Sequence, residues 1–439
     1  MKRLITLAIM VAFILGGFGV AQAIEFKAKG DWQIGVMGVS NPGFDEDEDV
    51  DEFMATTRVR TTFEFIASEN VKGVMRVHSG DRRWGAAGLG REDDTFEFDR
   101  AYLDFMVPDT AVNMRVGKQP VALPNTLGSH ILDDQIWGVQ GSSALTEEVG
   151  LTLGWGRAQD VHTSGDNKND EVDYFYAIAP VTMDGFEVNP FLVYGMMGSS
   201  AVEGADYGDS DQSSSVFWAG VNFSVDMFDP IVVKGDFNYG TQGSDISGND
   251  AGSEARGWIA DVAVQYKMDM VTPEVFFLYE SGESSSSGTD STKRSKVMPS
   301  ISGDLFGIST FGMSGSPLRG IGRATLNQYD GISAFGPSGK MAFGAKLGDI
   351  TFYDNVSHDL QLTYYQGTNH KDLRDEGGEF FTTKDNVWEV TFDTHYQMYE
   401  NLAAILELGY LHPSFDRDSE RGIDEDSSFK AAAGFRYMF

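Results

Sequence analysis

The sequence predicts an all-β fold, an antiparallel transmembrane β-barrel of 16 to 18 strands with short turns at one end and long loops at the other. Apolar residues recur with a period of two along most of the chain, which is typical of strands with one apolar and one polar face. Short and long polar connections alternate, as they do in membrane-spanning barrels. The chain also ends on a strand pattern that is aromatic on one face.

The last segment, residues 428–439, shows the pattern most clearly. Its odd positions are apolar or aromatic, and its even positions carry Lys430, Arg436, Met438 and small residues. An ordinary strand of a β-sandwich could have the same period. The aromatic end nevertheless resembles the terminal strand of bacterial outer-membrane barrels. That resemblance implies that Phe435, Tyr437 and Phe439 form the signal read by the barrel assembly machinery.

The other end of the chain predicts a cleaved signal peptide over residues 1–23. Lys2 and Arg3 precede an uncharged run at 4–20, which is followed by the small-residue cleavage site Ala21-Gln22-Ala23. A membrane-spanning helix is the alternative, but a cleavage site directly after the run favours removal. No later stretch approaches the roughly 18 to 20 apolar residues that such a helix needs.

Composition excludes several classes of function. The chain has no cysteine, which rules out a lipoprotein anchor, a thiolate metal site and a thiol nucleophile. Its 33 basic and 66 acidic residues give a formal net charge of −33, which becomes −35 when Lys2 and Arg3 are removed with the signal peptide. So acidic a surface argues against a nucleic-acid partner. The mean hydropathy of −0.24 does not separate a soluble protein from a barrel, because only alternate residues of a barrel strand face lipid.

The connections support one closed barrel over residues 24–439. Short turns at 108–110, 183–185, 227–229 and 398–400 alternate with long polar connections at 160–170, 199–212, 242–254, 368–384 and 414–426. A closed barrel leaves no edge strand unpaired, which a lipid environment requires. With both termini on the periplasmic side, the number of strands must be even. The unusually long, Ser- and Gly-rich segment 284–339 either folds into the pore or hides a further hairpin.

An acidic loop lies near the start of the mature chain, at residues 40–52. It fails as an EF-hand calcium site, because its sixth position is Val50 and its twelfth is Thr56. A solvated loop is therefore the favoured interpretation. Weak bridging of divalent ions to lipopolysaccharide by Asp45, Asp47 and Asp49 is the alternative, and we expect no other metal site.

Candidate pore residues lie on the early strands. Five arginines share the parity that faces the lumen: Arg58, Arg60, Arg76, Arg100 and Arg115. Residues 121–135 follow the strand of Arg115 and are unusually apolar for an outer loop, which indicates that they pack against another part of the protein. The alternative is a set of solvated lumen arginines next to an unrelated loop.

The mature chain resembles bacterial trimeric porins, and most closely the homotrimeric outer-membrane porins of sulfate-reducing bacteria. The resemblance rests on the signal peptide, the repeated strand pattern, the strand Arg100-Ala101-Tyr102-Leu103-Asp104-Phe105 and the aromatic terminus. It implies that residues 121–135 fold inward as a constriction loop, with Asp133 and Asp134 facing the arginines. It also implies a homotrimer in the outer membrane of a Gram-negative cell, in contact with lipid and lipopolysaccharide.

We therefore expect a water-filled channel for passive diffusion of small hydrophilic solutes and ions. A channel selective for a sugar or an oxyanion is the main alternative. The sequence lacks H-E-x-x-H and G-x-S-x-G, and its seven histidines show no metal-ligand spacing, so we expect neither an enzyme nor a cofactor. A barrel enzyme or a structural envelope protein is the remaining alternative.

Overall fold

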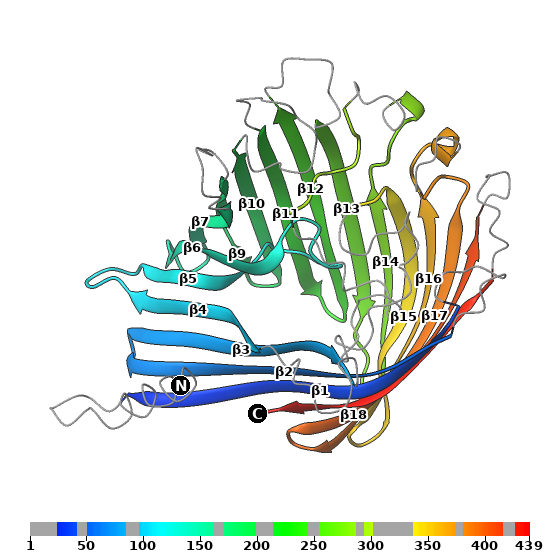
Figure 1. Ribbon diagram of the computed structural model, residues 1–439, viewed down its shortest axis with the longest axis horizontal. Coiled ribbons are helices and arrows are strands. Elements are labelled where there is room, and N and C mark those ends of the chain that lie inside the picture. The colour runs from blue at the N-terminus through cyan, green and yellow to red at the C-terminus, as the bar shows by residue number, and fades with distance from the viewer. Residues whose placement is uncertain are drawn as a thin grey trace.

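The computed structural model describes residues 24–41, 51–84, 96–160, 171–198, 214–244, 254–286, 294–301, 337–374, 381–415 and 426–439. These residues form one antiparallel sheet of 19 strand segments closed into a barrel (Figure 1). Within these ranges no helix is long and apolar enough to span a membrane. The predicted signal peptide, residues 1–23, and the acidic residues Asp45, Asp47 and Asp49 lie outside the described residues.

Strands that follow one another along the chain are paired, except that β8 and β9 both pair with β10. The strands are β1 (Glu25–Ser40), β2 (Asp51–Ser68), β3 (Val71–Arg83), β4 (Phe96–Met106), β5 (Asn113–Ala122), β6 (Asp133–Ala144), β7 (Gly150–Asp160), β8 (Glu171–Ile178), β9 (Val181–Met183), β10 (Phe186–Met197), β11 (Ser214–Phe228), β12 (Ile231–Ser244), β13 (Ala255–Tyr266), β14 (Thr272–Glu280), β15 (Lys340–Tyr353), β16 (Val356–Gly367), β17 (Asn386–Tyr399), β18 (Leu402–Ser414) and β19 (Ser428–Met438). A short 3₁₀ helix, η2 (Lys371–Arg374), lies between β16 and β17.

The barrel has 18 strands, in agreement with the predicted range of 16 to 18. Segments β8 and β9 both pair with β10, so they form a single strand interrupted at Ala179 and Pro180. The sheet closes where β1 pairs with β19, from Asp31 opposite Met438 to Ser40 opposite Phe429. Strand β14 pairs directly with β15, so the segment 284–339 adds no strand to the wall between them.

The two faces of the wall follow the parity of the sequence. In β19, Phe429, Phe435 and Tyr437 are 47%, 50% and 40% exposed, whereas the intervening Lys430 and Ala432 are each 1% exposed. The outer face of the other strands is likewise apolar, with exposed Phe26, Leu103, Trp137, Leu192 and Phe343 among many others. An apolar band outside and a polar lining inside are what lipid and water on opposite faces require.

The larger of two hydrophobic clusters lies inside the barrel, and a smaller one lies at the seam of β1, β18 and β19. In the larger cluster, residues of the 121–135 segment pack against large side chains from β8, β10, β11 and β14, including Tyr174, Phe191, Trp218 and Phe276. The segment 294–301 joins the same cluster through Met298. The opposite inner wall, formed by β2 to β5, carries the arginines. The docked segments therefore fill the side of the interior that lies opposite the arginines.

Candidate functional site: the interior of the barrel

Strands β5 and β6 leave the barrel wall together and carry their hairpin tip inside. Pairing of β5 with β4 ends at Lys118 opposite Ala101, and pairing of β6 with β7 begins at Trp137 opposite Arg157. Two glycines, Gly117 and Gly138, face each other across the hairpin at this bend. Gly117 has φ +128°, and a Cβ atom there would lie 2.3 Å from the carbonyl oxygen of Ala101. Only glycine permits so close an approach of the two backbones.

The hairpin tip docks on the far inner wall through apolar side chains. Leu123, Leu127, Ile131 and Leu132 are each at most 4% exposed. Figure 1 shows the chain between β5 and β6 running across the barrel toward β12 and β13. Full burial of an aliphatic side chain stabilises a structure by about 1.5–3 kcal/mol. The unusual apolarity of residues 121–135 thus corresponds to a docked segment.

Polar contacts fix the register of this docking. The backbone N–H of Thr126 donates to Asp236 Oδ2 of β12 at 2.7 Å, and Asn222 Nδ2 of β11 donates to Thr126 Oγ1 at 2.8 Å. These contacts join residues about a hundred positions apart in the chain. Apolar packing alone has no preferred direction. These hydrogen bonds therefore fix the position of the hairpin tip on the wall.

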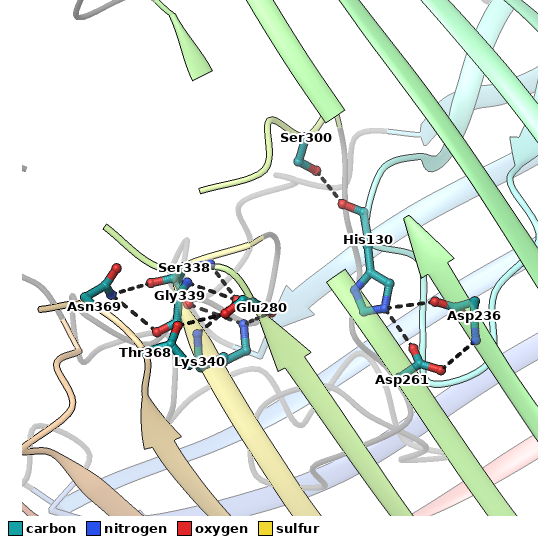
Figure 2. Close-up of polar contacts among 10 residues, drawn as sticks. All are labelled: His130, Asp236, Asp261, Glu280, Ser300, Ser338, Gly339, Lys340, Thr368 and Asn369. Atoms are coloured by element: carbon teal, nitrogen blue, oxygen red, sulfur yellow. Dashed lines mark hydrogen bonds and ion pairs between the residues drawn. The ribbon is translucent and has the colours of Figure 1, made fainter. Parts of the chain in front are cut away.

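His130 lies at the centre of the docked segment, between two carboxylates of the wall (Figure 2). Its Nε2 is 3.0 Å from Asp261 Oδ2 of β13 and 3.7 Å from Asp236 Oδ1 of β12. The three side chains are at most 1% exposed. Burial lowers the pKa of His130, because a charged imidazole loses its hydration there. We call His130, Asp236 and Asp261 the buried triad.

A second chain segment, residues 294–301, covers the docked hairpin. Ile301 N–H donates to the carbonyl oxygen of Ile131 at 3.0 Å, and Ser300 Oγ donates to that of His130 at 3.0 Å. The indole N–H of Trp218 donates to the carbonyl oxygen of Pro299 at 2.7 Å. This part of the long segment 284–339 therefore lies inside the barrel. Residues 287–293 and 302–336 lie outside the described residues.

A buried ion pair holds the other end of that long segment. Lys340 Nζ of β15 is 2.8 Å from Glu280 Oε1 of β14, and their side chains are 2% and 0% exposed. Glu280 Oε2 also accepts from the backbone N–H groups of Ser338 at 2.8 Å and Gly339 at 3.0 Å (Figure 2). The carboxylate thus organises the start of β15.

The five predicted arginines line the opposite inner wall, and we call them the arginine wall. Arg76 Nε on β3 donates to both oxygens of Asp99 on β4, at 2.8 and 2.9 Å. Arg115 Nε on β5 donates to Asp104 Oδ2 at 3.0 Å. Arg58 and Arg60 of β2 lie opposite Gln33 and Asp31 of β1. Arg76 and Arg115 are therefore each paired with an aspartate of the neighbouring strand β4.

Arg100 connects the arginine wall to the inward hairpin. Its Nε donates to Gln135 Oε1 at 2.9 Å, at the point where the hairpin leaves β4. Asp134 Oδ1 accepts from the backbone N–H of Gln135 at 2.7 Å. Asp133 and Asp134 are both exposed. The carboxylates bonded to Arg76 and Arg115 are Asp99 and Asp104.

Sequence analysis missed those two partners and the buried triad. Asp104 shares lumen parity with Arg100, so a cross-strand comparison with Arg115 would have found it. Asp99 has the parity of the outer face, but the pairing shifts between Arg76 and Val77, and this bulge turns both Asp99 and Arg100 inward. Asp236 and Asp261 lie opposite each other on the neighbouring strands β12 and β13, which only the strand register shows. His130 reaches them from a distant part of the chain.

The predicted assembly residues lie on the outer face at the seam of the barrel. The carbonyl oxygen of Phe439 accepts from Gly30 N–H at 2.8 Å. Its ring centroid is 5.8 Å from that of Trp32, in an edge-to-face arrangement, and 5.2 Å from that of Tyr437. A Cβ atom at Gly30 would overlap the ring of Phe439. The last residue thus closes the aromatic cluster that joins β1 to β19.

Comparison with known proteins gives structural relatives only. No protein-family model matches the chain, and no curated protein sequence is similar to it. Among solved structures, OpdQ of Pseudomonas aeruginosa is similar with a TM-score of 0.56 at 11% identity, covering 94% of this chain and 99% of that one. OccAB4 of Acinetobacter baumannii gives 0.55 at 11% identity, with 96% and 100% covered. The outer membrane protein OprD of Pseudomonas aeruginosa gives 0.53 at 10% identity, with 96% of each chain covered. At these identities the similarity establishes a shared barrel fold.

Proposed function

We propose that the protein is an outer-membrane porin that lets small hydrophilic solutes and ions diffuse through a water-filled channel. The observation that carries the proposal is the divided interior, in which the arginine wall faces a hairpin that is folded inward and anchored across the barrel. The apolar outer face supports a place in a bilayer. The 18-stranded fold shared with an outer membrane protein supports the same location.

Residues 121–135 are the constriction of this channel. They occupy one side of the lumen, so solutes pass between them and the arginine wall. Selection among solutes then depends on the width of that gap and on the charges around it. These charges are the five arginines with Asp99, Asp104, Asp133 and Asp134.

Recording from the purified protein in planar lipid bilayers tests the proposal. We expect stepwise current increases whose size grows in proportion to salt concentration. Flat traces from protein shown to be folded would contradict it. A barrel enzyme or a structural envelope protein would then be favoured over a channel.

A substrate-selective channel for oxyanions is the second candidate, and the arginine wall favours it. Arg100 donates to a neutral amide rather than to a carboxylate, so part of its positive charge remains available to a passing anion. Conductance that saturates with one organic anion, but not with chloride, would favour this candidate over general diffusion.

Homotrimeric assembly belongs to the same proposal. A closed cyclic trimer needs matching lipid-facing surfaces. The outer face of the early strands is hollowed in two places, one lined by Phe65, Leu103 and Val116, the other lined by Trp137 and Trp155 with a volume of about 490 Å³. Mass measurement in mild detergent should give three chains per particle. A particle of one chain would remove the trimer from the proposal without affecting the channel.

The aromatic cluster that joins β1 to β19 supports an assembly role for Phe435, Tyr437 and Phe439. We expect removal of Phe439 to lower the amount of assembled barrel, while the molecules that do assemble conduct normally. Quantification of outer-membrane fractions measures this. Normal levels would contradict the assignment.

A further inference from the structure

The buried triad places two carboxyl groups beside one imidazole, and each of the three side chains is at most 1% exposed. Among the residues that the structure describes, no lysine or arginine forms an ion pair with Asp236 or Asp261. Within these residues, His130 is the basic side chain that contacts the two carboxyl groups. Buried charges in proteins are paired or coordinate metals, since an isolated one costs far more than a hydrogen bond returns.

Neutral hydrogen-bond donors hold the two carboxyl groups in place. Asp236 accepts from Asn238 Nδ2 at 2.9 Å and from the backbone N–H of Thr126, and Asp261 accepts from the backbone N–H of Asp236 at 3.2 Å. These donors orient one oxygen of each carboxylate toward Nε2 of His130. Such outer partners are what orients the ligands of metal sites.

The distances fit a small cation at the centre. One oxygen of each aspartate and one ring nitrogen of His130 lie within 4.8 Å of one another. Nε2 is 3.0 Å and 3.7 Å from the two oxygens. In a tetrahedral zinc site with bonds of about 2.0–2.1 Å, two ligand atoms lie roughly 3.3 Å apart. One of the two measured distances is slightly shorter than this value and the other is slightly longer.

We propose that His130, Asp236 and Asp261 bind a divalent transition-metal ion, best matched by zinc, that ties the inward hairpin to the far wall. One imidazole nitrogen and two carboxylate oxygens are a ligand set that zinc accepts. The ion would neutralise the carboxylates and link β12 and β13 to a segment more than a hundred residues away. Sequence spacing could not reveal the site, because each ligand comes from a different part of the chain.

Equilibrium dialysis of the folded, detergent-purified chain against zinc, with metal measured by mass spectrometry, tests the proposal. We expect one zinc ion per chain. Asp261→Asn keeps the shape of the side chain but removes its charge, and His130→Gln removes the nitrogen ligand. Loss of an outer-shell partner alone costs about 10–100-fold in metal affinity, so either variant should weaken binding by more than that.

Two control variants distinguish loss of a ligand from loosening of the hairpin and from weak ion binding at the surface. Ser300→Ala loosens the same hairpin by removing the hydrogen bond to the His130 carbonyl but keeps all three ligands, so zinc binding should persist. Asp133→Asn with Asp134→Asn removes exposed carboxylates that bind ions weakly, and should also leave the stoichiometry unchanged.

Cobalt provides an independent measurement of the same site. Co²⁺ in a four-coordinate nitrogen and oxygen site absorbs visible light far more strongly than the hydrated ion. We expect that spectrum from the native chain and from Ser300→Ala, and its loss in Asp261→Asn and His130→Gln. Absence of stoichiometric zinc in the folded native chain, or equal binding by both ligand variants, would overturn the proposal. Neither result bears on channel formation, which is measured separately by conductance.

Discussion

The two inner walls of the barrel use charged residues in opposite ways. On the arginine wall, the ion pairs differ in exposure: the Arg115 side chain is 35% exposed, whereas those of Arg76 and Asp99 are 10% and 12% exposed. On the far wall, the buried triad and the Glu280–Lys340 pair are at most 2% exposed. Exposed pairs contribute about 0–1 kcal/mol to stability, whereas breaking a buried pair costs about 3–5 kcal/mol. We therefore expect the far wall to act mainly on stability and on the position of the hairpin, and the more exposed arginines to act on passing ions.

The strongest test of this contrast removes the apolar attachment of the hairpin. Leu127→Ala and Ile131→Ala together should release it from the far wall, because truncating a buried aliphatic side chain costs about 2–5 kcal/mol. We expect single-channel recordings to show transitions to a larger conductance. Leu153→Ala, at a position 53% exposed on the outer face, is the matched control and should leave conductance unchanged. Unchanged conductance in a folded double variant would mean that the hairpin is not the narrowest part of the pore.

A second test compares a buried pair with an exposed one. Lys340→Met leaves the Glu280 carboxylate without its counter-charge and should lower stability by about 3–5 kcal/mol. Lys29→Met breaks the 2.9 Å pair with Glu64, in which the lysine side chain is 62% exposed, and should cost about 0–1 kcal/mol. The stability of each variant is measured as the temperature at which the band of folded protein disappears from a denaturing gel. Equal shifts in the two variants would contradict the distinction between the walls.

A third test concerns the bend that brings the hairpin inside. Gly117→Ala places a Cβ atom 2.3 Å from the Ala101 carbonyl oxygen at a φ of +128°, and such strain costs about 1–3 kcal/mol. We expect less folded protein and a less stable docked hairpin. Gly38→Ala in β1 meets nothing within 4 Å and should behave like the native chain. If the two variants fold equally well, the bend does not depend on glycine.

The sequence predicted the wall of this barrel better than its contents, for a physical reason. Lipid outside and water inside force alternate residues of a strand to differ, so parity alone located Phe435, Lys430 and the five arginines. The inward hairpin depends on Gly117 and Gly138 facing each other, which only the strand register shows. The pairing of Asp99 with Arg76 depends on a bulge that reverses parity. The buried triad depends on three segments meeting in space.

The smallest expected effect concerns ion selectivity, and it tests the arginine wall directly. The net charge of −33 would favour cations at the mouth, but charges in outer loops are screened beyond about 8–10 Å at ordinary salt. Charges beside the hairpin act over shorter distances. Because Arg76 and Arg115 are paired with Asp99 and Asp104, the two signs nearly cancel, and we expect weak selectivity in the native pore.

Substitution should unbalance these charges in a predictable direction. Arg60→Gln with Arg115→Gln leaves Asp104 without its cation and should shift the reversal potential toward cations. Asp133→Asn with Asp134→Asn should shift it toward anions. Neutralising Asp45, Asp47 and Asp49 should matter mainly at low salt. If at high salt that loop variant moves the reversal potential as far as the double arginine variant does, ion selection occurs at the mouth and the arginine wall is not the selective element.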